Sequence, residues 1–272
     1  MNLTIFNKSC EDMSDIEDES IACIFTSPPY ALAKDYGDTG CIGGDDNLEA
    51  YSTYLTRMKQ VLIECFRVLQ QGRYIGINIA DIIQTDSRSR EKKPIAFNYM
   101  QMLFDIGFEY CDYICWKKPD GMSTQKRFGV LIQNPYPMYY HPNNVYEPIL
   151  LFKKPGKWFP SDEQKKDNTL NWKELQKFQT DIWEVHPETH VDHPAPFPWK
   201  LPLLFFELFV CKGETVLDPF LGSGSSLMAA KQLKMNGIGY EINPKFVELC
   251  KKRIQPNQQD LFGEQCKFEV LK

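Results

Sequence analysis

The residues best suited to chemistry in the first part of the chain form the run TSPPY, from Thr26 to Tyr30. Ser27 offers a hydroxyl oxygen, and Pro28 offers a carbonyl oxygen that no amide hydrogen at Pro29 competes for. Tyr30 adds an aromatic face on which a flat ring can stack. Such a group could accept the hydrogens of a planar amine and hold its ring. A simpler alternative is a turn that ends a strand, because proline pairs often mark turns.

A second group of residues suits a bound ligand, and it comes nearly two hundred residues later. In the run DPFLGSGSS, from Asp218 to Ser226, an apolar strand turns through Gly222 and Gly224 into an alanine-rich helix. Glycine is needed where backbone must approach a ligand closely, and serines can satisfy the first free amides of a helix. Leu227 occupies the place of the third glycine of the dinucleotide fingerprint, so a pyrophosphate ligand is disfavoured. A tight turn without any ligand is the alternative.

A carboxylate follows at the tip of the next predicted strand. The apolar run 238–240 ends at Glu241, about 20 residues past the glycines, and Asn243-Pro244 then begins another helix. Rossmann-like folds use an acidic residue at this position to bind ribose hydroxyls. We therefore expect Glu241 to hold two vicinal hydroxyls.

The two runs and their order resemble one enzyme family. TSPPY resembles the catalytic loop of the S-adenosylmethionine-dependent enzymes that methylate exocyclic amines of DNA bases. DPFLGSGSS, followed by GIGYEI, resembles their methionine-side cofactor loop. The catalytic-first order resembles the beta group, and the resemblance covers nearly the whole chain. It implies an α/β fold: a Rossmann-like methyltransferase with a mostly parallel central sheet, circularly permuted motif order and an irregular target-recognition region.

The resemblance also implies a cofactor, S-adenosyl-L-methionine, and roles for individual residues. Loop 220–224 would wrap the methionine moiety and Glu241 would hold the ribose. The segment 193–197 is similar to an element that binds the carboxylate end of the cofactor, with Phe197-Pro198 where the family has lysine-proline. Lys8-Ser9 stands where the family often has glycine-aspartate, which leaves a hydroxyl for the adenine. The implied cofactor set is Ser9, Phe197, Asp218, Pro219, Phe220, Gly222, Gly224, Ser225 and Glu241, and the catalytic set is Ser27, Pro28, Pro29 and Tyr30.

The expected reaction is direct methyl transfer to an amine nitrogen of a flipped-out base, without a covalent enzyme intermediate. In the family, serine at the position of Ser27 is commoner in cytosine-N4 enzymes and aspartate in adenine-N6 enzymes, so cytosine N4 is favoured. Methylation of a ring carbon is disfavoured, because the sequence has no Pro-Cys step that would supply a cysteine nucleophile. Adenine N6, an RNA or protein-glutamine substrate, and a non-catalytic DNA-binding module are the alternatives.

Predicted elements would position these groups. The apolar run 21–25 stops at the proline pair, which puts Ser27 at the carboxyl end of a strand. Apolar residues spaced by three and four over Leu48–Leu69 predict a helix, and Gly72 is its expected stop. Further strands are expected over 74–79, 108–116, 145–152 and 215–220, and further helices over 94–106 and 201–210.

The middle of the chain is the predicted target-recognition part. Periodicity weakens over 117–184, and long loops in a compact enzyme are usually functional, although a surface insertion is the alternative. The expected division is a catalytic half over 1–116, this recognition region over 117–184 and a cofactor half over 185–272. Trp116 and Phe128 could support nucleotides. Each cluster of basic residues is expected either to contact the phosphates of double-stranded DNA or to be only a solvated surface, with equal weight given to the two. The basic residues are Arg88, Arg90, Lys92, Lys93, Lys117, Lys118, Lys126 and Arg127.

The bulk composition narrows the class of protein. A chain of 272 residues with 43% hydrophobic content can bury the core of one α/β domain. The net charge of −5 argues against a general polyanion coat but allows a local basic face. Nine cysteines without a CxxC pair, and no apolar run long enough for a membrane span, lead us to expect a reducing, cytoplasmic location. The four histidines lack metal-ligand spacing, and a cognate restriction endonuclease is a candidate partner.

Overall fold

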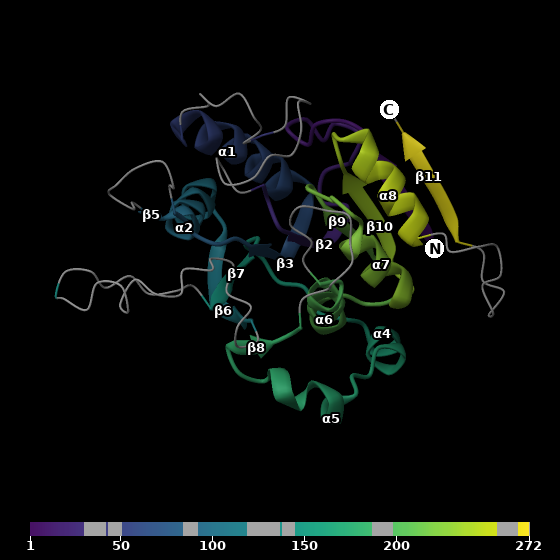
Figure 1. The fold of residues 1–272 in the computed structure, drawn as a ribbon. Helices are drawn as coiled ribbons and strands as arrows, with labels where there is room; N and C mark the ends of the chain where they lie inside the picture. The colour runs from purple at the N-terminus through teal and green to yellow at the C-terminus, as the bar shows by residue number, and fades with distance from the viewer. Residues whose placement is uncertain are drawn as a thin grey trace.

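A nine-stranded sheet forms the centre of the computed structural model, in the order β11-β1-β10-β9-β2-β3-β7-β6-β8 (Figure 1). The structure describes residues 1–29, 42, 51–83, 92–118, 137, 145–186, 198–254 and 266–271. Strand β7 is antiparallel to both of its neighbours, and all the other strand pairs of this sheet are parallel. The prediction of an α/β fold with a mostly parallel sheet is therefore confirmed. The strands are β1 (Asn2–Phe6), β2 (Ile21–Thr26), β3 (Leu69–Asn78), β6 (Glu109–Lys117), β7 (Tyr146–Lys153), β8 (Ile182–Glu184), β9 (Thr215–Asp218), β10 (Asn236–Tyr240) and β11 (Lys267–Leu271), with β4 (Ile82–Ile83) and β5 (Lys92–Lys93) as a separate pair.

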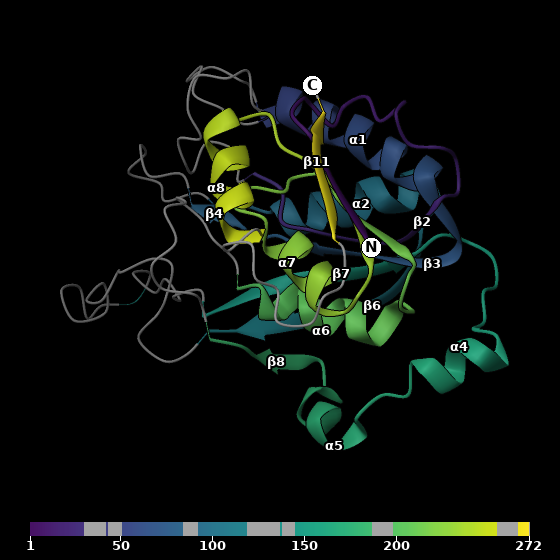
Figure 2. The same cartoon turned by 90° about the vertical axis from the view of Figure 1, so that its right-hand side faces the viewer.

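Helices cover both faces of the sheet, and the sheet separates the apolar core into two layers (Figures 1 and 2). Helices α1 (Tyr51–Val68) and α2 (Ile95–Ile106) pack on one face. Helices α6 (Lys200–Phe209), α7 (Ser225–Gln232) and α8 (Pro244–Ile254) pack on the other. The short helices α4 (Asp162–Asp167) and α5 (Trp172–Leu175) lie outside α6 (Figure 2). Among the described helices, none has the length and apolar character that crossing a membrane requires.

The three-and-four spacing that predicted α1 is the spacing of its buried face, which includes Tyr54, Met58, Leu62 and Cys65. The helix occupies Tyr51–Val68, and β3 follows it directly at Leu69. The prediction that Gly72 stops the helix is therefore wrong. Gly72 lies inside β3 with φ of 74°, and a Cβ added there would lie only 2.6 Å from the backbone nitrogen of Trp158. Glycine is needed at this point because a neighbouring segment crosses the strand closely.

The predicted recognition region over 117–184 contains a strand of the central sheet. Strand β7, expected over 145–152, lies between β3 and β6 and pairs with both. After it come α4, α5, the 3₁₀ turn Gln176–Phe178 and β8, which extends the sheet beside β6. The sequence predicted neither the short helices nor β8. Each of them has at most six residues, which is too short for a reliable periodic pattern.

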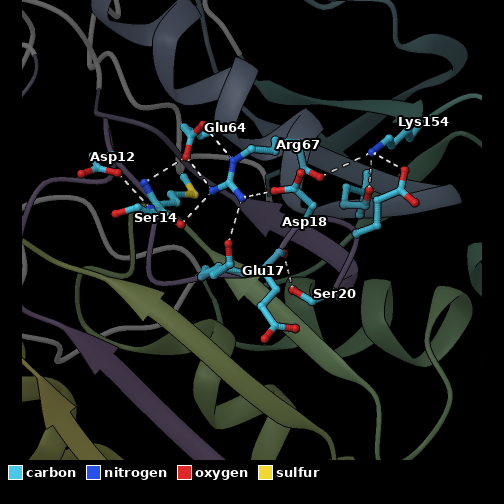
Figure 3. A network of polar contacts seen from close by, with 12 residues as sticks. Asp12, Ser14, Glu17, Asp18, Ser20, Glu64, Arg67 and Lys154 are labelled. Carbon is cyan, nitrogen blue, oxygen red and sulfur yellow. Dashed lines mark hydrogen bonds and ion pairs between the residues drawn. The ribbon is translucent and has the colours of Figure 1, made fainter.

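Arg67 fastens the connection between β1 and β2 to the C-terminal end of α1 (Figure 3). Its guanidinium donates hydrogen bonds to the carbonyl oxygens of Met13 at 2.8 Å and Ile16 at 2.9 Å, and to Asp18 Oδ1 at 2.6 Å. It also binds both carboxylate oxygens of Glu64, and this hydrogen bonding lowers the pKa of that carboxyl group. The network fixes the segment from which β2 starts, and β2 carries the first sequence motif at its other end.

Candidate active site

The two sequence motifs follow neighbouring strands at the centre of the sheet. Strands β2 and β9 pair in parallel. From β2 the chain passes through α1 to β3 on one side, and from β9 it passes through α7 to β10 on the other side, with α1 and α7 on opposite faces (Figure 1). In α/β proteins, the crevice outside the carboxyl ends of strands at such a reversal of order is where ligands bind. The fold thus brings together Thr26 and Asp218, which are 192 positions apart.

One buried carboxylate connects the two strand ends. Asp218 Oδ1 accepts hydrogen bonds from Thr26 Oγ1 at 2.7 Å and from the Phe220 amide at 3.1 Å. Asp218 Oδ2 accepts a hydrogen bond from the Ser226 hydroxyl in the first turn of α7. Burial raises the pKa of Asp218 to about 6, although these hydrogen bonds favour its charged form. Because only 1% of Asp218 is exposed, its carboxylate braces the loops and does not present itself to a ligand.

The proline segment that follows β2 is supported from the helical side. Pro28 is buried, whereas Ser27 and Pro29 are half-buried. The Tyr54 hydroxyl of α1 donates a hydrogen bond to the Pro29 carbonyl oxygen at 2.9 Å and lies 2.8 Å from the hydroxyl of Tyr99 in α2. The predicted base-stacking residue, Tyr30, lies outside the described residues. The tyrosine support was not predicted, because it joins helices whose apolar faces gave no sign of a polar contact.

The glycine loop after β9 is folded tightly against α8. Gly222 and Gly224 have φ of 53° and 88°, a region that favours glycine. A Cβ added at Gly224 would overlap the sulfur of Cys250 in α8, so a larger residue does not fit there. Of the predicted cofactor residues in this loop, Pro219, Gly224 and Ser225 are buried, whereas Phe220 and Gly222 keep exposed surface. The loop therefore offers a ligand mainly the ring of Phe220 and the backbone at Gly222.

Glu241 lies beside that loop, at the carboxyl end of β10. Its Oε2 accepts a hydrogen bond from the Gly222 amide at 2.8 Å, and its Oε1 accepts one from the Asn243 amide at 2.7 Å. The side-chain amide of Asn7, just after β1, donates to the Glu241 carbonyl oxygen at 2.7 Å. Burial raises the pKa of Glu241 to about 7 against the effect of the two amide donors. Each carboxylate oxygen retains lone-pair capacity, so the half-buried group could still accept hydrogen bonds from a diol.

Ser9 lies in the turn after β1, and its hydroxyl is already in use. Ser9 Oγ donates a hydrogen bond to Glu11 Oε2 at 3.0 Å and accepts one from the Glu11 amide at 3.3 Å. Arg57 of α1 pairs with the same carboxylate at 2.8 Å and, by hydrogen bonding, lowers its pKa. The sequence indicated the hydroxyl of Ser9 but not the carboxylate of Glu11 two residues later. The other predicted cofactor residue, Phe197, lies outside the described residues.

The structure removes one predicted DNA contact and one predicted nucleotide support. Lys118 is 8% exposed, its Nζ lies 2.5 Å from Glu147 Oε1, and it stacks over the ring of Trp116. Its charge is therefore matched inside the protein, and the prediction that Lys118 contacts phosphates is wrong. Trp116 is also buried and donates a hydrogen bond to the Val185 carbonyl oxygen at 2.8 Å, so it belongs to the core and does not stack on nucleotides.

The remaining predicted basic residues are only partly described. Lys117 is half-exposed and pairs with Glu184 at 2.7 Å, and Lys93 Nζ lies 5.9 Å from the ring centre of Tyr51. The backbone of Lys92 is part of β5. In the part of the chain that the structure describes, no cluster of histidine, cysteine or acidic residues is arranged to hold a metal ion. The predicted DNA contacts Arg88, Arg90, Lys126 and Arg127, and the predicted support Phe128, lie outside the described residues.

Asn78 is a buried polar residue at this sheet edge that the sequence did not single out. Ile77 pairs with Thr26, so Asn78, the last residue of β3, lies at the level of the first sequence motif. Its side-chain nitrogen donates a hydrogen bond to the Pro148 carbonyl oxygen at 3.2 Å. Its side-chain oxygen has no hydrogen-bond partner within the described chain, although the residue is fully buried. A single asparagine at the end of an apolar strand carried too little pattern to be noticed.

Comparisons with known proteins agree with this geometry. The model of the DNA methylase family N6_N4_Mtase matches residues 21–252. The Type II methyltransferase M.MthZI of Methanothermobacter thermautotrophicus is 27% identical over an aligned length of 273 residues, gaps included, and the alignment covers 92% of this chain and 76% of the relative. The Type II methyltransferase M.MjaI of Methanocaldococcus jannaschii is 29% identical over an aligned length of 276 residues, and the alignment covers 91% of this chain and 89% of the relative.

Solved structures show the same fold over the whole chain. The putative DNA modification methylase TTHA0409 of Thermus thermophilus, in complex with S-adenosyl-L-methionine, superposes with a TM-score of 0.77 at 25% identity and covers 99% of both chains. The cytosine-N4-specific PvuII DNA methyltransferase gives a TM-score of 0.72 at 18% identity, covering 98% of this chain and 95% of that one. With a family match over most of its length, this chain belongs to the N6/N4 DNA methylase family.

Proposed function

We propose that this protein transfers a methyl group from S-adenosyl-L-methionine to the exocyclic N4 amine of cytosine in double-stranded DNA. Membership of the DNA methylase family gives the reaction class and the DNA substrate, and S-adenosyl-L-methionine is the methyl donor of that class. The observation that carries the choice of cytosine is Ser27, a serine at the first position of the SPPY tetrad, which directly follows β2, the strand that pairs with β9.

The chemistry of the acceptor explains why such a segment is needed. The lone pair of an exocyclic amine is delocalised into the base, so the nitrogen is a poor nucleophile until its hydrogens are held by acceptors. The Ser27 hydroxyl and the Pro28 carbonyl oxygen are the proposed acceptors, with Pro29 keeping the segment rigid. Tyr30 is the proposed stacking surface for a base turned out of the duplex. Transfer is then direct, and positioning and electrostatics supply most of the catalysis.

The donor is proposed to bind on the neighbouring loop. Glu241 accepts hydrogen bonds from the ribose hydroxyls. The loop from Pro219 through Phe220 and Gly222 to Ser225 encloses the methionine part, and Gly224 allows the turn. Ser9 and Phe197 complete the set at the adenine and carboxylate ends. The bound cofactor supplies an electrophilic methyl group on a sulfonium.

The DNA is proposed to bind across the same edge of the sheet. Lys93 and Lys117 are the described candidates for phosphate contacts, and Arg88, Arg90, Lys92, Lys126 and Arg127 complete the proposal. Target recognition is assigned to residues within 117–184, between catalytic and cofactor halves over 1–116 and 185–272. Several relatives are Type II methyltransferases, so we include a cognate restriction endonuclease in the proposal.

The decisive experiment uses purified protein, plasmid DNA and cofactor carrying an isotopic label in its methyl group, followed by mass spectrometry of the nucleosides. Labelled N4-methylcytosine is expected with the wild type and strongly reduced with Ser27→Ala. Ser52→Ala is the matched control, because this serine is exposed on α1 and belongs to neither motif. Labelled N6-methyladenine would overturn the choice of base. An absence of any labelled nucleoside in the plasmid DNA would overturn the DNA substrate.

A further inference from the structure

The backbone pairing between the two motif-bearing strands stops before the motifs begin. Strands β2 and β9 are paired at Cys23 with Val216 and at Ile24 with Leu217. Beyond that point the two chains continue toward the proline segment and the glycine loop. A side-chain bridge, from Thr26 Oγ1 to Asp218 Oδ1 at 2.7 Å, connects them there.

This bridge is part of a three-way junction. The carboxylate of Asp218 holds Thr26 on the catalytic side, and it holds the Phe220 amide and the Ser226 hydroxyl on the cofactor side. Thr26 directly precedes Ser27, and Phe220 begins the glycine loop. One group therefore determines how far the proposed base acceptors lie from the proposed cofactor loop.

We infer that Thr26 is a positioning residue for methyl transfer, acting through Asp218 to fix the catalytic segment relative to the cofactor loop. Thr26 is 3% exposed and Asp218 is 1% exposed, so neither side chain is open to a ligand. Direct transfer requires the donor, the methyl group and the acceptor nitrogen in line, and a displacement of about 1 Å can reduce such a rate by about 100-fold. The alternative is that Thr26 only fills space at the end of β2.

The test compares Thr26→Val, which keeps the shape and removes the hydroxyl, with Thr26→Ser, which keeps the hydroxyl and removes the methyl group. Single-turnover transfer of labelled methyl into DNA is measured beside the affinity for S-adenosyl-L-methionine. We expect Thr26→Val to reduce the single-turnover rate by about 10- to 100-fold while cofactor affinity changes by only about twofold. Thr26→Ser is expected to keep a rate within about threefold of the wild type.

Thr4→Val is the matched control, because the Thr4 hydroxyl also donates to a carboxylate, Glu269 at 3.2 Å, but between β1 and the edge strand β11. It should transfer methyl at the wild-type rate. A wild-type rate in Thr26→Val, or an equal loss in Thr26→Ser, would overturn the inference. If Thr26→Val does not fold, Thr26→Cys, with its weaker donor, should be intermediate between threonine and valine, and full activity in that variant would also overturn it.

The inference rests on methyl transfer to DNA and not on the identity of the base. The readout is total labelled methyl in DNA, and nucleoside analysis of the same samples identifies the base. A finding of N6-methyladenine would therefore refute the proposed cytosine specificity and leave the comparison of the Thr26 variants intact.

Discussion

The affinity for S-adenosyl-L-methionine should rise with pH through neutrality, and Glu241→Gln should abolish that rise. Burial raises the pKa of Glu241 to about 7 in the free protein, while amide donors at Gly222 and Asn243 hold its two oxygens. Ribose hydroxyls donate hydrogen bonds, so they bind best to the ionised carboxylate. Lowering the pH protonates that carboxylate, and cofactor binding then has to displace the proton.

The size of the effect follows from the pKa. With a pKa of about 7, the group is ionised in about a tenth of molecules at pH 6 and in about nine tenths at pH 8. The dissociation constant should therefore fall by about tenfold between these values, or about 1.4 kcal/mol. In the free protein the sign for stability is opposite: because the folded pKa lies above the ordinary value of 4.5, the free energy of unfolding falls as pH rises from about 4.5 to 7.

Titration calorimetry of the wild type and Glu241→Gln at pH 6, 7 and 8 measures this directly. The amino group of the cofactor also titrates near pH 8, but it does so with both proteins, so the difference between them isolates Glu241. Glutamine must turn its amide nitrogen toward the Gly222 or Asn243 amide, so the variant should bind about 10- to 100-fold more weakly at pH 8.

The same substitution at Glu248, which lies exposed on α8, is the matched control and should leave the pH profile of binding unchanged. Equal pH dependence in the wild type and Glu241→Gln would refute the assignment of the ribose to Glu241. It would also indicate that the carboxylate only braces the glycine loop.

Two further predictions concern stability, measured as the free energy of unfolding in denaturant. Gly224→Ala should lower the free energy of unfolding by about 3 kcal/mol, because the added methyl group overlaps α8 and the φ of 88° is unfavourable for alanine. Gly213→Ala is the control and should cost about 1 kcal/mol, because its φ is also positive, at 81°, but nothing lies within 4 Å of the added methyl group. Equal costs would refute the steric argument. Lys118→Met should cost about 3 kcal/mol or more, because the buried Glu147 carboxylate loses its lysine. Lys117→Met, at the exposed pair with Glu184, should cost less than about 1 kcal/mol. The reverse order of the two costs would contradict the buried pairing.

Features with local physical causes were predictable from the sequence. Proline at 28 and 29 cannot continue a ladder, so β2 had to end before this pair, and it ends at Thr26. The glycines at 222 and 224 predicted a turn, and both have positive φ. The carboxylate at Glu241 was expected at the tip of the next strand, and β10 ends at Tyr240. Each of these depends on only a few consecutive residues.

Features decided by distant neighbours were not predictable. Strands β1 and β11 have five residues each, and they are held by pairing: β1 pairs with β10 and β11, and the edge strand β11 pairs with β1. Lys118 belonged to a basic dipeptide that suggested a surface, but Glu147 and Trp116 enclose it. Gly72 followed a helical pattern and suggested a helix stop. It lies within β3 instead, and glycine is required there because the backbone of Trp158 comes close to the strand. In all three cases the deciding atoms come from another part of the chain.

The two motifs of the candidate site lie far apart in the sequence, and the sheet brings them together. Thr26 and Asp218 are separated by 192 positions, yet the entropic cost of closing a loop grows by only about 0.6 kcal/mol for each doubling of its length. The separation along the chain therefore costs little once the sheet forms. Accurate placement needs short-range contacts, and the pairing of β2 with β9 provides them only up to Ile24 and Leu217. The last step of alignment then falls to the buried hydrogen bonds of Asp218, which gives a physical reason for a fully buried carboxylate between the two loops.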